Sequence, residues 1–174
     1  MTEIYGIGGL LRYKSWADDV LYDSLGRLAD DKLTEQRPML FGNILSLLNH
    51  VFAMDVAWRS NLQGGVHDMQ TRNPENPPAF AELREKQSAI NDWYREYAGR
   101  LADSELNELV EFTFIGGGEG CMRRGEILHH VVNHATYHRG HIEGALYQMG
   151  VEPGTTDLPV FLREGGLLIG GSWT

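Results

Sequence analysis

The segment "HHVVNHATYHRGH", residues 129–141, holds five of the seven histidines in this chain. Because an α-helix turns about 100° per residue, four of them would share a stripe roughly 80° wide on one helix face: His130, His134, His138 and His141. Imidazoles four positions apart, such as those of His134 and His138, direct two nitrogens at a common point. The spacing therefore predicts a metal site on one face of a helix.

Two histidines hold a divalent metal ion poorly, so a third ligand from another helix is expected. His50 stands in the middle of an otherwise apolar helical segment and is the natural candidate. We predict a site made of His50, His134 and His138, with its other coordination positions open to water or substrate. Sites with three protein ligands are usually catalytic or substrate-binding, since structural zinc sites usually have four. Zinc and nickel are expected first, and iron, cobalt or manganese are alternatives.

The number of ligands stays open at this point. His130 lies four residues before His134, and His141 lies three residues after His138, so either is a candidate fourth ligand or a hydrogen-bond partner of a ligand. The last two histidines are expected at the solvated surface, one in a polar loop and one on another helix face: His67 and His129.

Several other chemistries lack their motifs. "HATYH" has Ala135 where a zinc protease of the HExxH type has glutamate, and GxSxG is absent. The glycine clusters "GIGG" and "GGGEG" lack the strand-to-helix setting of a phosphate-binding loop. The formal net charge of −9, without a lysine or arginine block, argues against a nucleic-acid partner. We therefore expect a small-molecule substrate.

Length and composition place the site in an ordinary globular protein. At 174 residues, with 42% hydrophobic and 22% charged residues, the chain is expected to form one domain over residues 1–174. Neither a signal peptide nor a run of ~20 apolar residues is visible, so no membrane association is expected. The lone Cys121 agrees with a reducing compartment. These features indicate a cytoplasmic protein.

Helical periodicity in four segments indicates how the histidines are brought together. The segments are expected at about residues 10–28, from Asn43 as N-cap to a stop at Gly64, at 79–101, and at 122–149 before Gly150. Residues 64–78 contain three prolines and form a long loop, "VEFTF" is a short extended run, and the tail has one short helical turn at most. The expected fold is all-α: a four-helix bundle with a long crossover between the second and third helices.

Three segments resemble the DinB family of metal-dependent helical-bundle proteins: "YKSWADDVLYDSL", "FGNILSLLNHVFAMDVAW" and "HVVNHATYHRGHIEGALYQMGVEPGTTDLPVFL". The resemblance covers nearly the whole chain, and its most specific part is the NHxxxHR helix followed by Asp157-Leu158-Pro159. It implies a bundle with a long second connection, the ligands His50, His134 and His138, and a homodimer. His141 stands where the family commonly has glutamine, which leaves the ligand count open.

The resemblance does not imply one reaction, because many family members have no assigned activity. The first hypothesis is a metal-dependent S-transferase using a low-molecular-weight thiol, or a hydrolase, acting on a small molecule. Alternatives are a non-catalytic metal-binding stress-response protein and a helical interaction module. No catalytic residue is assigned, and the candidates for the pocket are Tyr13, Trp16, Asp55, Tyr137 and Arg139.

Overall fold

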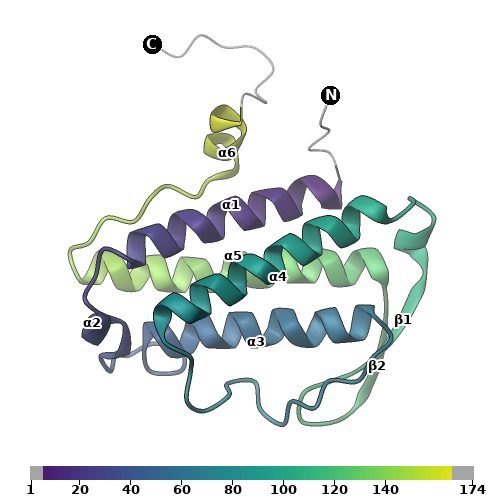
Figure 1. The fold of residues 1–174 in the computed structure, drawn as a ribbon, viewed down its shortest axis with the longest axis horizontal. Coiled ribbons are helices and arrows are strands. Elements are labelled where there is room, and N and C mark those ends of the chain that lie inside the picture. The colour runs from purple at the N-terminus through teal and green to yellow at the C-terminus, as the bar shows by residue number, and fades with distance from the viewer. Residues whose placement is uncertain (1–5, 166–174) are drawn as a thin grey trace.

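Four long helices make up most of the computed structural model, which describes residues 6–165. They lie side by side as a bundle (Figure 1): α1 (Ile7–Leu25), α3 (Ile44–Leu62), α4 (Phe80–Arg100) and α5 (Arg124–Gln148). The smaller elements are α2 (Asp30–Thr34), the 3-10 helix η1 (Glu105–Asn107), β1 (Leu109–Thr113), β2 (Glu119–Arg123) and α6 (Leu158–Glu164). The predicted all-α four-helix bundle is confirmed.

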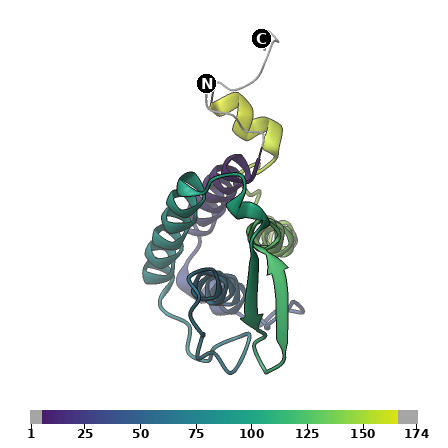
Figure 2. The same cartoon turned by 90° about the vertical axis from the view of Figure 1, so that its right-hand side faces the viewer.

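The connection between α3 and α4 determines the topology. Residues 63–79 run back along the length of the bundle, so α3 and α4 point in the same direction (Figure 1). Viewed along its axis, α1 and α3 each lie between α4 and α5 (Figure 2). The predicted long crossover is therefore confirmed, and it brings α3 against α5 in antiparallel orientation.

The core consists of two apolar clusters at opposite halves of the bundle. One contains the end of α1 and the start of α3 and α4, with Leu25, Leu47 and Leu83 buried. The other contains the start of α1 and α5, with Leu11 and Val131 buried. Burial of these apolar faces supplies the main driving force for the bundle. No helix within residues 6–165 is long and apolar enough to cross a membrane.

The helix ends follow from local residues. The side chain of Asn43 accepts a hydrogen bond from the backbone N–H of Ser46 at 2.8 Å, which confirms it as the N-cap of α3. Gly150 follows α5 with φ of 71°, a backbone conformation that glycine adopts without the steric cost of a Cβ. The first helix begins at Ile7, about three residues earlier than predicted. It also ends about three residues earlier, at Leu25, because the chain already turns at Gly26.

A β-hairpin between α4 and α5 corrects the predicted start of the last long helix. The first four residues of the extended run "VEFTF" are confirmed as part of β1, which ends at Thr113. This strand pairs with β2 in antiparallel register, with Phe112 opposite Gly120. Met122 belongs to β2, so α5 begins at Arg124 instead of Met122. The turn uses positive φ at Gly116, Gly117 and Gly118. The sequence analysis missed β2 because "EGCMR" shows no alternation of buried apolar residues.

Candidate metal centre

Three histidines from two helices bring their Nε2 atoms together. His50 lies on α3, and His134 and His138 lie one turn apart on α5. The Nε2 atom of His134 lies 3.2 Å from that of His50 and 3.1 Å from that of His138. One nitrogen from each ring falls within 4.8 Å of those of the other two. The structure thus joins the three residues that the sequence analysis grouped.

Backbone and aromatic contacts orient the His50 ring. Its Nδ1 lies 2.6 Å from the backbone carbonyl oxygen of Arg72, and a carbonyl can only accept. Nδ1 therefore carries the proton, which leaves the Nε2 lone pair free toward the other histidines. The ring of Phe41 lies 4.6 Å from the His50 ring, with the Phe41 backbone at φ of 61°. Left-handed backbone at a non-glycine residue is uncommon and concentrates at functional sites.

Burial keeps the three imidazoles in the form that binds metals. His50 and His138 are 5% and 4% exposed. Desolvation, with the neighbouring rings of His138 and His50, lowers the pKa of His134 to about 3. Desolvation followed by His50 lowers the pKa of His138 to about 4. Desolvation also lowers the pKa of His50. Near neutral pH the rings are therefore neutral, and neutral imidazole is the metal-binding form.

The donor set fits a divalent metal ion. Two nitrogens bound to one tetrahedral zinc ion at ~2.0–2.1 Å lie about 3.3 Å apart. The Nε2 atom of His134 lies at nearly this distance from those of His50 and His138, at 3.2 and 3.1 Å. The Nδ1 atoms of His134 and His138 are buried and have no hydrogen-bond partner within the described residues. A neutral ring without a metal needs a donor and an acceptor, and burying either one unpaired costs free energy. A metal ion bound to the three Nε2 atoms would take their lone pairs and keep the protons of His134 and His138 on Nδ1, as the Arg72 carbonyl does for His50, so the donor set is compatible with metal binding.

A cavity of about 570 Å³ opens beside the three histidines. Apolar side chains from α3, from the turn before it and from the hairpin form most of its wall: Phe41, Met54, Trp58, Phe112, Phe114 and Ile115. Volumes of ~300–1,000 Å³ are typical of small-molecule sites. The three Nε2 atoms therefore border a space that can hold a small molecule.

The other histidines take different positions. His130 lines the same cavity, with its ring 5.1 Å from Trp58, and His141 is exposed with its ring 5.8 Å from that of His138. Neither joins the group of converging nitrogens. His129 is exposed as expected. His67 differs from the expectation, because it is only partly exposed, lines the cavity, and donates from Nε2 to the carbonyl oxygen of Thr113 at 2.9 Å.

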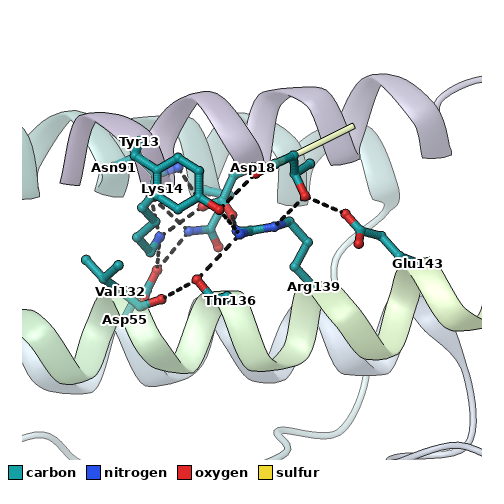
Figure 3. Close-up of polar contacts among 11 residues, drawn as sticks. Tyr13, Lys14, Asp18, Asp55, Asn91, Val132, Thr136, Arg139 and Glu143 are labelled. Carbon is teal, nitrogen blue, oxygen red and sulfur yellow. Dashed lines mark hydrogen bonds and ion pairs between the residues drawn. The ribbon is translucent and has the colours of Figure 1, made fainter. Parts of the chain in front are cut away.

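None of the five residues considered for the pocket lines this cavity. Tyr137 is exposed on α5, and Trp16 donates to Glu164 of α6 at 3.0 Å. The other three belong to a buried polar network (Figure 3): Tyr13, Asp55 and Arg139. Their polar or aromatic character suggested a substrate pocket, but they join helices inside the core instead.

Lys14 is the centre of that network. Its ammonium is 1% exposed and donates to Asp18 at 3.0 Å and Asp55 at 2.9 Å (Figure 3). It also donates to the side-chain oxygen of Asn91 at 2.6 Å, so one cation joins α1, α3 and α4. Burial opposes its charge, but the carboxylates of Asp18 and Asp55 outweigh burial and raise the pKa of Lys14.

Arg139 connects α5 to the same network and to the tail. Its guanidinium donates to the hydroxyl of Tyr13 at 2.9 Å and to the hydroxyl of Thr156 at 3.2 Å. The Thr156 hydroxyl in turn donates to Glu143 at 2.8 Å (Figure 3). The contact of Arg139 with Glu143 is thus mediated by a residue of the tail, and it fixes the tail against the bundle.

The fold and the site together define a class: a four-helix bundle protein with a three-histidine cluster, compatible with metal binding, beside an apolar cavity. The chain belongs to the DinB family, whose model matches residues 2–166. The sequence is similar to Protein DinB of Bacillus subtilis (strain 168), with 26% identity over 158 residues that cover 88% of this chain and 91% of that protein.

A solved structure supports the fold. The crystal structure of a DinB-like protein from Bacillus cereus ATCC 10987 matches with a TM-score of 0.53 and 17% sequence identity. The match covers 95% of this chain and 96% of the other. At this level of identity the likeness concerns the arrangement of the helices and carries no argument about ligands.

Proposed function

We propose that His50, His134 and His138 bind one divalent metal ion, zinc or nickel in the first place, and that the chain acts on a small molecule held in the adjoining cavity. The observation that carries this proposal is the convergence of three Nε2 atoms at the wall of a cavity of about 570 Å³. A site with only three protein ligands leaves positions for water or substrate.

The cavity wall indicates where the nucleophile comes from. No cysteine, serine, lysine or carboxylate is among the described residues that line the cavity, and Cys121 is exposed on β2 outside it. The chain therefore offers no strong nucleophile there, and an external thiol or water is required. A bound divalent metal lowers the pKa of a water or thiol, which supplies the nucleophile near neutral pH.

The protein's own residues would support such a reaction in three ways. The carbonyl of Arg72 holds the proton of His50 on Nδ1, so the Nε2 lone pair is left free toward His134. Burial keeps His134 and His138 neutral. The aromatic wall excludes water and holds an apolar substrate. Transfer of a thiol to an electrophile, or hydrolysis, is the reaction class that these features favour.

Metal content and turnover of the same preparations test this function. Elemental mass spectrometry on wild type, His50→Ala and His138→Ala should give near one equivalent, then a large loss in both variants. His129→Ala, which changes an exposed histidine of α5, should keep the metal. The metal-loaded protein is then assayed with monobromobimane and a small thiol: sulfur bonds to the bimane carbon, bromide leaves, and the thiol proton goes to solvent.

Each result has a clear meaning. Thiol-dependent turnover that is lost in His138→Ala, with the fold intact by circular dichroism, supports the S-transferase. One equivalent of metal with a large rise in melting temperature, but no turnover of thiol or hydrolysable substrates, supports a non-catalytic metal-binding stress-response protein instead. No metal after reloading with zinc and nickel contradicts the proposal.

A further inference from the structure

The cavity beside the histidines has a strongly aromatic wall. The ring of Trp58 lies 4.9 Å from that of Phe112, which lies 5.0 Å from that of Phe114. Phe41 joins them from the turn before α3. Such a wall gains free energy by covering a flat or branched apolar body, and it holds aromatic rings in edge-to-face contacts. The cavity thus favours a ligand with an apolar body over a sugar or a polar peptide.

The charge at the cavity differs from that of the whole chain. The chain carries a formal net charge of −9. Yet no aspartate or glutamate is among the described residues of the cavity wall, whereas Arg72 is. The cavity is therefore a locally cationic space in an acidic protein, and such a space attracts anions.

Arg72 is available to a ligand and held in place by its backbone. No hydrogen bond or ion pair joins its guanidinium to another residue within 6–165, and the residue is exposed. Its carbonyl accepts from His50 at 2.6 Å, and two residues later the carbonyl of Pro74 accepts from Asn49 at 3.1 Å. The loop that carries Arg72 is thus bound to α3 at two points, with the guanidinium left free.

We propose that the cavity binds a small carboxylate with an aromatic or branched apolar body, and that Arg72 pairs with the carboxylate while the body lies on the aromatic wall. The inference deepens the proposed function and rests on it, because it names the substrate class of the same site. A guanidinium pairs with a carboxylate through two parallel hydrogen bonds, which fixes the orientation of the ligand as well as its charge.

Comparison with a neutral analogue of such a ligand measures how much Arg72 contributes to binding. Phenylacetate and phenylacetamide have nearly the same shape, but only the first carries a charge. Hydrogen bonds to charged groups contribute enough to favour phenylacetate by about tenfold or more. The dissociation constants are measured by NMR titration of the protein in two forms, one treated with chelator and one loaded with zinc, because a metal ion also attracts carboxylates.

Three variants separate the causes. In the chelated protein, Arg72→Gln should weaken the binding of phenylacetate about tenfold and leave the binding of phenylacetamide unchanged. Arg72→Lys should lose less affinity for phenylacetate than Arg72→Gln. Arg100→Gln removes an exposed arginine that pairs with Glu96 at the end of α4, and it should change neither constant. Resonances of Trp58 and Phe112 should shift on binding.

The inference is overturned if phenylacetamide binds wild type as tightly as phenylacetate, if Arg72→Gln weakens both ligands equally, or if neither ligand binds. Failure of the proposed function gives a different result. In that case zinc does not bind, but phenylacetate still binds the chelated protein with the same dependence on Arg72, so the ligand class stands without the metal.

Discussion

His50 and His134 are 84 positions apart in the sequence, and their Nε2 atoms lie 3.2 Å apart in the structure. The two residues meet because the return of residues 63–79 along the bundle brings α3 beside α5. The two Nε2 atoms come together only when α5 has packed against α3. The candidate metal centre is therefore a product of the bundle topology, and its ligands should couple metal binding to global stability.

Acid should destabilise the metal-free protein through these histidines. The pKa of His134 is about 3 in the folded state, well below the ordinary value of 6.5. The contribution of this histidine to stability is therefore complete above pH 6.5 and is lost as the pH falls from 6.5 toward 3. Between these two pH values only the unfolded chain takes up the proton, and the free energy of unfolding falls by about 1.4 kcal/mol per pH unit for such a histidine. Urea unfolding at about pH 7.5 and about pH 5 measures the change.

The matched comparison uses two glutamine variants. His134→Gln should lose less stability between the two pH values than wild type, whereas His129→Gln, on the exposed face of α5, should behave like wild type. An equal pH dependence in wild type and His134→Gln would contradict the assignment of a buried neutral imidazole.

Loss of the buried cation should destabilise the bundle far more than loss of a surface cation. Lys14→Met leaves Asp18 and Asp55 buried without their partner, and breaking a buried ion pair on one side costs about 3–5 kcal/mol. Lys32→Met removes an exposed pair with Glu35 and should change little. The difference is read from urea unfolding midpoints at constant m-value. Similar losses of stability in both variants would show that the Lys14 network does not stabilise the core of the bundle.

A glycine in the last turns of α5 and a glycine just after that helix should change stability in opposite directions when each is replaced by alanine. Gly144 is helical, with no atom within 4 Å of where a Cβ would stand, so Gly144→Ala should stabilise the protein by about 0.5–1 kcal/mol. Gly150 has φ of 71°, so Gly150→Ala adds a Cβ in a left-handed conformation and should destabilise by about 1–2 kcal/mol. Melting temperatures with equal metal content give both signs, and a loss of stability in Gly144→Ala would show that this helix face is covered.

Local sequence patterns predicted the helices and the histidine cluster for physical reasons. The 3.6-residue period puts His134 and His138 on one face wherever the helix lies, and Asn43 and Gly150 fix helix ends through their own backbone contacts. The third ligand required only one mid-helix histidine, His50, in an otherwise apolar segment. These features depend on a few neighbouring residues, so they are readable without the fold.

The cavity was not predictable in this way. Arg72 and His67 come from the polar loop, and nothing in their surroundings in the sequence indicates that this loop returns past α3. Phe112 comes from a hairpin whose second strand has no apolar alternation. The reverse error concerned Asp55 and Arg139, whose charges suggested a substrate pocket. Their partners, Lys14 and Tyr13, lie on α1, and only the packed bundle shows that these charges are used within the core.

The cross-strand pair of Phe112 and Gly120 gives a test of the cavity that leaves the histidines untouched. A Cβ on Gly120 would stand 2.5 Å from the Phe112 ring, so Gly120→Ala must push that ring out of its place between Trp58 and Phe114. Overpacking of this kind costs about 1–3 kcal/mol. The variant should keep its metal, because His50, His134 and His138 are not contacted by Gly120, but it should lose affinity for phenylacetate.

The control is Cys121→Ala, which changes an exposed neighbour on β2 and should keep both the metal and the affinity for phenylacetate. If Gly120→Ala binds phenylacetate as wild type does, the aromatic wall at the hairpin does not contact the ligand, because a displaced Phe112 ring would change the surface on which the ligand lies.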